Sequence, residues 1–265
     1  MATAVFFHAH PDDEAIATGG TMARMAADGH RVVLITATRG ELGEVPDGIL
    51  DPGQTLAERR ADELAAACAV LGVARHEYLG YGDSGMAGED SNNDPGCFWQ
   101  ADVEEAAERL AAILRSENAE VLTAYDENGN YGHPDHIQVH RVGLRAGQMA
   151  AVPRVFMATV NRDRLLALLE TADGAALVAA EEEGPAVDNL GVSEERITTV
   201  VDVSGVLGQK RRAMQAHASQ ISETSFFLSM PPETFAAVWG QEWYIRVGAE
   251  PSRPYEDSLL ASEAH

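Results

Sequence analysis

Short runs of apolar residues alternate along the chain with longer segments in which apolar positions recur every three or four residues. The short runs predict buried strands, and the longer segments predict amphipathic helices. Strands are expected at residues 5–9, 31–36, 77–79, 120–125 and 197–203, and helices at 14–28, 55–71, 100–117, from 134 onward and at 208–221. This alternation predicts an α/β fold with a mostly parallel, Rossmann-like sheet and helices on both faces.

Two stretches show neither the apolar runs of strands nor the three-to-four-residue apolar repeat of helices. Residues 80–97 are rich in Gly, Asp, Asn and Ser, which indicates an active-site loop rather than a linker. Residues 172–195 are acidic and rich in small side chains, which indicates a surface insertion. The chain of 265 residues is long enough for one large α/β domain, and we expect a single domain over residues 1–265.

Charge and composition exclude several classes of partner. The net charge of −23 makes nucleic acid and anionic membrane surfaces poor partners. The longest apolar runs are too short to span a membrane, and no signal-like segment follows Met1, so a cytoplasmic location is expected. Cys68 and Cys97 form no C-x-x-C motif and are expected to be reduced thiols. The sequence leaves a homo-oligomer open.

Two clusters of chemically active side chains directly follow predicted strands. Segment 10–14 has the sequence HPDDE, and segment 133–136 has the sequence HPDH. In open α/β sheets, ligands bind outside the carboxyl ends of the strands. Residues three apart on a helix share one face, so each cluster can direct its first and fourth side chains at one point. The two clusters side by side would supply enough imidazole and carboxylate for a catalytic metal site.

Each cluster alone also fits an ordinary helix start. Proline at the first helical position and acidic residues in the first turn complement the helix dipole. The histidines favour the functional interpretation, because mixed imidazole and carboxylate ligands with a fourth position open to water form hydrolytic zinc sites. The carboxylates of segment 10–14 would neutralise a cation beside two positive helix ends, and those helix ends would favour a developing oxyanion.

Further motifs extend the pattern beyond the two clusters. They are RADEL at 60–64, DSGM at 83–86, YDENGNYGHPDH at 125–136, and a segment from Lys210 through His217 to Gln220. With these motifs in this order, the chain resembles the LmbE-like (PIG-L) zinc-dependent N-deacetylases. The resemblance implies a hydrolase that removes the N-acetyl group from an N-acetylglucosaminyl conjugate (a sugar–inositol, a thiol-pathway compound or a glycosylated natural product), releasing acetate and a free amine.

The resemblance also implies a role for each residue of the two clusters. The ligands of one zinc ion, or of another divalent metal such as Fe²⁺, would be His10, Asp13 and His136. Asp12 would be the general base that deprotonates the attacking water. His133 and Tyr131 would stabilise the oxyanion, and Asp135 would hold the ring of His133.

Substrate contacts follow from the same resemblance. Arg60 and Asp83 would bind sugar hydroxyls, although Arg60 could instead form an exposed ion pair on its own helix. Asn130 stands where relatives often have a second glycine, and asparagine tolerates left-handed conformations better than most residues. His140 is expected to be structural, and His217 is expected to support the wall of the pocket.

Three other functions compete with N-deacetylation. A mycothiol S-conjugate amidase would cleave a larger acyl group at the same nitrogen. A two-histidine, one-carboxylate iron oxygenase has the right ligand types, but the predicted alternation of strand and helix argues against the β-rich scaffold of those enzymes. A non-catalytic module that binds sugar or metal would not need Asp12 and His133 in addition to the ligands.

Overall fold

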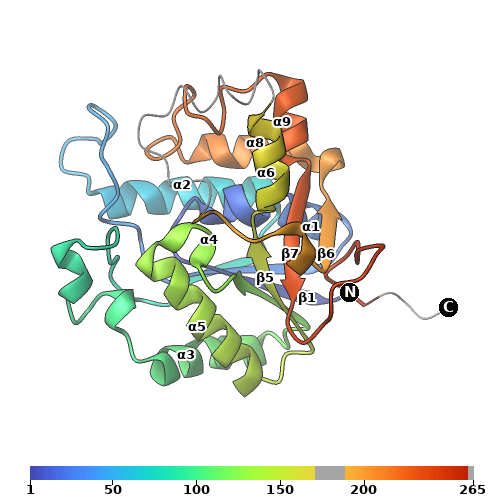
Figure 1. Cartoon of the computed structure of the whole chain (residues 1–265). Helices are drawn as coiled ribbons and strands as arrows, with labels where there is room; N and C mark the ends of the chain where they lie inside the picture. Colours follow the sequence, from blue (N-terminus) through green and yellow to red (C-terminus); the bar gives the residue numbers. More distant parts are fainter. Residues whose placement is uncertain (171–188, 262–265) are drawn as a thin grey trace.

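The computed structural model describes residues 1–170 and 189–261, and its centre is a seven-stranded sheet (Figure 1). The strands lie in the order β3-β2-β1-β4-β5-β7-β6. Their bounds are β1 Thr3–His8, β2 Arg31–Thr36, β3 Arg75–Tyr78, β4 Val121–Tyr125, β5 Arg154–Thr159, β6 Thr199–Asp202 and β7 Gln241–Arg246. The first five strands of this order pair in parallel, and β7 is antiparallel to both β5 and β6. The predicted mostly parallel α/β fold is confirmed.

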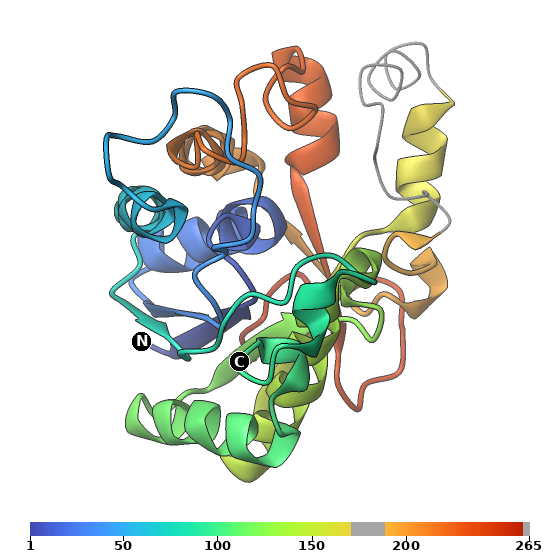
Figure 2. The same cartoon turned by 90° about the vertical axis from the view of Figure 1, so that its left-hand side faces the viewer.

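Helices cover both faces of the sheet. The longer ones are α1 Gly19–Ala27, α2 Leu56–Leu71, α3 Val103–Ser116, α5 Pro134–Met149, α6 Arg162–Leu169, α8 Leu207–Ala216 and α9 Pro232–Trp239. Helices α1, α2 and α8 pack together on one side, and α3 packs on α5 on the other (Figure 2). Since the central strands are covered on both faces, β1 and β4 are almost wholly buried, as expected for a parallel sheet.

The order of the strands changes direction beside β1, the position at which open α/β sheets leave a crevice outside the strand ends. From β1 the chain continues to its neighbour β2, whereas the strand on the other side of β1 is β4. Such a change of direction is the point where ligands bind in open α/β sheets. The segment after β1 and the segment after β4, which carry the two histidine clusters, both begin at this crevice.

Local sequence signals explain how α2 and α5 begin. Thr55 and Glu58 form a capping box at the start of α2. At α5, Pro134 occupies the first turn and the ring of His133 accepts the N–H of Asp135. The short helix α4, Gly129–Gly132, packs tightly before it, since a Cβ on Gly129 would lie 2.5 Å from the Cβ of His136.

Several elements depart from the expected pattern. The predicted helix at 14–28 begins as a π-helix, Glu14–Thr18, and the predicted helix at 208–221 ends at Ala216. Strands β5 and β7 and helix α9 were not predicted. Residues 80–97 are largely irregular, with one short 3-10 helix at Asp90–Asn93. The predicted insertion at 172–195 lies mostly outside the described residues. Within the described part of the chain, no helix combines the length and apolar character that a membrane crossing requires.

A buried ion pair ties β7 and α8 to α1. Glu242 on β7 accepts the backbone N–H groups of Gly20 and Thr21 at 2.7 and 2.8 Å, which caps the start of α1. The ammonium of Lys210 lies 2.5 Å from the same carboxylate, and both side chains are buried. The single lysine of the chain therefore neutralises a carboxylate that satisfies helix donors.

We expect Lys210→Met to lower the free energy of unfolding by about 3–5 kcal/mol, because it leaves the buried charge of Glu242 without its cation. Urea denaturation measures the change. The double variant Lys210→Met/Glu242→Gln is the control, since it removes both charges and should be less destabilised than the single variant. A single variant as stable as the parent protein would show that the pair contributes nothing.

Candidate active site

Three imidazoles meet at the crevice between the ends of β1 and β4. The ring centroids of His10 and His133 lie 4.7 Å apart, those of His10 and His136 5.4 Å, and those of His133 and His136 5.1 Å. All three residues are buried. One nitrogen of each ring lies within 4.8 Å of the others, so the three form a group that could hold a metal ion. Segments more than a hundred residues apart in sequence are thus brought together.

Asp13 lies between two of these rings. Its Oδ2 is 3.5 Å from Nδ1 of His10, and its Oδ1 is 3.3 Å from Nε2 of His136. Two ligand atoms of one tetrahedral zinc, each about 2.0–2.1 Å from the ion, are roughly 3.3 Å apart. Both ring nitrogens of His136 are buried without a hydrogen-bond partner among the described residues. Asp13 therefore lies within reach of both His10 and His136, although the two metal-capable groups among the described residues are His10 with His133 and His136, and His10 with Asp83 and Asp135.

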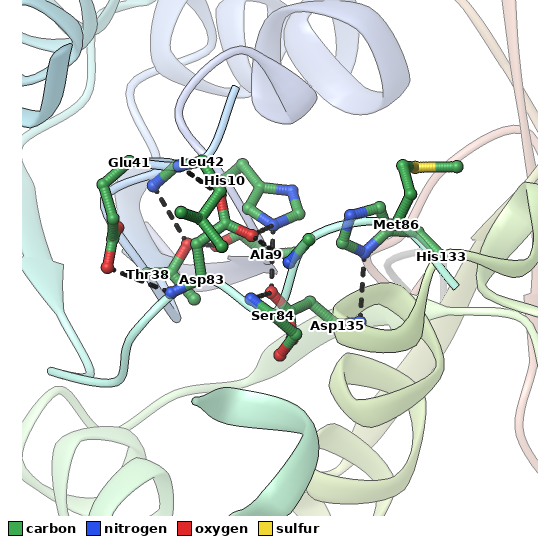
Figure 3. A network of polar contacts seen from close by, with 12 residues as sticks. Ala9, His10, Thr38, Glu41, Leu42, Asp83, Ser84, Met86, His133 and Asp135 are labelled. Carbon is green, nitrogen blue, oxygen red and sulfur yellow. Dashed lines mark hydrogen bonds and ion pairs between the residues drawn. The ribbon is translucent and has the colours of Figure 1, made fainter. Parts of the chain in front are cut away.

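The other side of the His10 ring faces two carboxylates (Figure 3). Its Nε2 lies 3.1 Å from Oδ2 of Asp135 and 3.5 Å from Oδ1 of Asp83. Burial lowers the pKa of His10, but Asp13, Asp135 and Asp83 outweigh it and raise the pKa well above its ordinary value. Metal-bound histidines usually donate their second N–H to a carboxylate, which leaves Nδ1 of His10 to face Asp13.

Asp135 contacts the ring of His133, as expected, but through its backbone rather than its carboxylate. Its carboxylate does not hold the ring of His133; it accepts the backbone N–H of Ser84 at 3.0 Å, the hydroxyl of Ser84, and the ring of His10. The backbone N–H of Asp135 instead donates to Nδ1 of His133 at 3.1 Å. The reason is that residues two apart on a helix do not face each other. Burial, with His10 and His136 nearby, lowers the pKa of His133 to about 3.

Asp12 has an unusual backbone and a charged neighbour. Its φ of 114° lies in a region that residues other than glycine rarely adopt. A guanidinium nitrogen of Arg60 lies 3.2 Å from its Oδ2. Burial raises the pKa of Asp12 to about 6, because it outweighs the opposing charge of Arg60. A carboxylate with a pKa near neutrality is suited to general base catalysis.

Arg60 and Asp83 are engaged within the protein. Arg60 is buried and donates to the carbonyl oxygens of Gly40 and Pro11, so the alternative of an exposed ion pair on its own helix is wrong. Asp83 accepts the backbone N–H groups of Leu42 and Gly85 at 3.2 and 2.9 Å. Contact of either residue with a sugar hydroxyl stays a prediction.

Tyr131 lies against the imidazoles on the short helix α4, whose start is held by Asp126. The ring centroids of Tyr131 and His136 are 4.8 Å apart. Asp126 is buried and accepts the backbone N–H groups of Asn128 and Asn130, each at 3.0 Å. Asn130 has a φ of 65°, the left-handed conformation that asparagine tolerates. Burial and the charge of Asp13 raise the pKa of Tyr131 well above its ordinary value, so its hydroxyl keeps a proton to donate.

Two contacts that shape the site could not be predicted from the sequence. Ser84 of the motif DSGM anchors Asp135. His217, for which a role in the pocket wall was expected, lies 2.6 Å from Glu14, a pairing that no local pattern indicates. His140 bonds the backbone carbonyl of Tyr125 at 3.0 Å, in keeping with the structural role expected for it.

Comparisons with known proteins match this chain to one family. Residues 5–147 match the family described as PIG-L: GlcNAc-PI de-N-acetylase. The 1D-myo-inositol 2-acetamido-2-deoxy-α-D-glucopyranoside deacetylase of Acidothermus cellulolyticus is 44% identical over 90% of this chain and 86% of that protein. The protein of the same name from Thermobifida fusca is 41% identical over 96% of this chain and 97% of its own length.

Among solved structures, the zinc inhibited form of teicoplanin deacetylase Orf2 matches with a TM-score of 0.59. The match covers 94% of this chain and 100% of that one at 19% identity, which shows a shared fold. The matched span of 143 residues includes both histidine clusters and exceeds half of the chain. The chain therefore belongs to the PIG-L family.

Proposed function

We propose that this chain hydrolyses the acetamide of 1D-myo-inositol 2-acetamido-2-deoxy-α-D-glucopyranoside, releasing acetate and a free amine. The observation that carries the proposal is the convergence of Asp13 with His10 and His136 beside Asp12. Deacetylases of the PIG-L family are metal-dependent. Relatives named for this substrate cover 90% or more of the chain at 41–44% identity, which supports the choice of sugar conjugate.

We assign the metal to Nδ1 of His10, the carboxylate of Asp13 and Nε2 of His136, and we propose Zn²⁺ as the ion. Zinc held in this way polarises a carbonyl group and lowers the pKa of water to about 7. Asp135 and Asp83 would keep the proton of His10 on Nε2 and so direct the lone pair of Nδ1 at the ion.

The hydrogen bond at Nδ1 of His133 separates this residue from the ligands. Since Nδ1 accepts the N–H of Asp135, the proton of the neutral ring is on Nε2. An Nε2–H group is a donor and cannot at the same time ligate a metal. The ring is therefore suited to donate to the carbonyl oxygen of the acetamide as that oxygen gains negative charge. The hydroxyl of Tyr131 would supply a second donor.

Asp12 would serve as the base and then as the acid. Its side chain is 17% exposed, so the carboxylate reaches the crevice while Arg60 holds its Oδ2. It would take a proton from the attacking water and pass that proton to the leaving nitrogen. An amide is a poor electrophile with a poor leaving group, so the reaction needs both the oxyanion donors and this proton transfer.

Turnover of the proposed substrate is the primary test. The purified protein with zinc should release a primary amine from the inositol conjugate, detected with fluorescamine, together with an equal amount of acetate. A chelator should abolish the release and added zinc should restore it. Absence of amine release from every N-acetylglucosaminyl conjugate offered would contradict the proposal and favour a non-catalytic binding module.

Asp12→Asn tests the base. Asparagine has nearly the same shape and tolerates a positive φ, so the fold and the bound metal should be retained. The turnover number should fall by about 10²- to 10⁴-fold, the usual contribution of a general acid or base. Amine release is measured with fluorescamine, and metal content is measured by mass spectrometry on the same preparation. Full activity in this variant would show that another group is the base.

Single alanine variants test the ligand assignment. Asp13→Ala and His136→Ala should lose the metal on dialysis, because each removes one of three protein ligands. His133→Ala is the matched control: it removes a neighbouring imidazole and should keep the metal while losing turnover. Equal loss of metal from His133→Ala would place this residue among the ligands. Metal content is measured by mass spectrometry on protein shown by circular dichroism to be folded.

A further inference from the structure

A fully buried ion pair joins the end of α8 to the turn that carries Asp12. Nε2 of His217 lies 2.6 Å from Oε1 of Glu14, and both side chains are 0% exposed. The two residues are 203 positions apart in the sequence. Burying a carboxylate is unfavourable unless a partner compensates for its charge, so each member of the pair depends on the other.

The second oxygen of Glu14 holds the backbone of Asp12. Oε2 accepts the N–H of Asp12 at 2.9 Å, two residues before Glu14 in the chain. Asp12 has the φ of 114° described above, and a strained residue persists only where its surroundings hold it. The backbone carbonyl of Asp12 accepts the N–H of Ala15 at 3.0 Å. Glu14 therefore holds the N–H group of Asp12, while the carbonyl group of Asp12 is held by the first turn of the following helix.

Helix α2 holds both ends of this arrangement. Arg60 contacts the carboxylate of Asp12 at 3.2 Å. One turn later, Glu63 accepts the backbone N–H of Ser219 at 3.0 Å and its hydroxyl at 2.6 Å, which anchors the segment that begins with His217. Residues three apart on a helix share a face. The same face of α2 therefore contacts the carboxylate of Asp12 and anchors the segment that contains His217.

We infer that Glu14 and His217 are positioning residues, which hold the backbone of Asp12 so that its carboxylate faces the reacting groups. The inference rests on the proposed function, in which Asp12 is the base. Neither residue is assigned contact with the substrate. Their effect is transmitted through one hydrogen bond to the Asp12 amide, so loss of the pair misplaces the base without removing it.

His217→Ala tests this role. The variant should bind as much metal as the parent and keep KM within about twofold, while kcat falls by roughly ten- to a hundredfold, as expected for a small misplacement of a catalytic group. His217→Gln is the conservative variant: its side-chain amide can donate to Glu14 and should recover most of the lost kcat. His30→Gln removes a half-buried imidazole that accepts the N–H of Ala2 before β1, at the opposite end of that strand from the turn, and should leave kcat unchanged.

The Asp12→Asn variant distinguishes positioning of the base from a purely structural role of His217. With Asp12→Asn already present, His217→Ala should cause no further loss of the residual rate, because the base that it positions is gone. An equal further loss there, or a kcat within about twofold of the parent in the single variant, would overturn the inference. If His217→Ala does not fold, Glu14→Ala, which removes the acceptor of the Asp12 N–H, is measured in its place with the same expected loss of kcat.

A crystal structure of His217→Ala, or of Glu14→Ala in its place, separates failure of this inference from failure of the proposed function. An inactive parent protein would count against the proposed function alone. The position of Asp12 would then decide the inference: a shift of φ away from its parent value supports it, and an unchanged φ overturns it.

Discussion

The site depends on the parallel pairing of β1 with β4. Ala4, Val5 and Phe6 pair with Val121, Leu122 and Thr123, so the two strands end side by side. Each strand is followed within a few residues by histidine and aspartate. No contact within either segment could create the group of three imidazoles, because each segment supplies only part of it. The hydrogen bonds of this one strand pair, with the burial of both strands, therefore set the geometry on which the chemistry rests.

Burial then decides the electrostatics at the crevice. Asp13, Asp83 and Asp135 all lie near the ring of His10. The nearby guanidinium of Arg60 is paired with a fourth carboxylate, that of Asp12. Charges removed from water need compensation, and an excess of carboxylates around imidazoles favours a cation. The raised pKa of His10 has the same cause, since the surrounding carboxylates favour positive charge on the ring. The site is thus charged to attract the cation that the family requires.

Much of the fold could be predicted because its signals are local. The capping box at Thr55 and Glu58 and the proline at the start of α5 mark helix starts within a few residues. The strand β7 could not be predicted in this way, because its Glu242 reads as a solvent-exposed charge. It is buried only because Lys210, 32 positions earlier, compensates for it. The π-helix at Glu14–Thr18 was missed for a similar reason, since the apolar spacing of one short turn does not separate it from an α-helix.

The same distinction applies within the site. The motifs made His10, Asp13 and His136 candidate ligands, because these side chains occur in short segments that resemble those of a known family. The direction of the Asp135 carboxylate was not predictable, since it depends on where the loop with Ser84 packs.

Asp12 was recognisable from the sequence, but its conformation was not. Its identity is local, but its conformation is maintained by groups from different parts of the chain: Arg60 of α2 at its carboxylate, and Glu14, paired with His217 after α8, at its amide. The two adjacent aspartates of this turn contact different groups: Asp13 lies near His10 and His136, and Asp12 lies near Arg60. In the proposed mechanism the first would face the metal and the second the substrate. The strained φ of Asp12 accompanies this divergence, and the buried groups around it maintain that conformation.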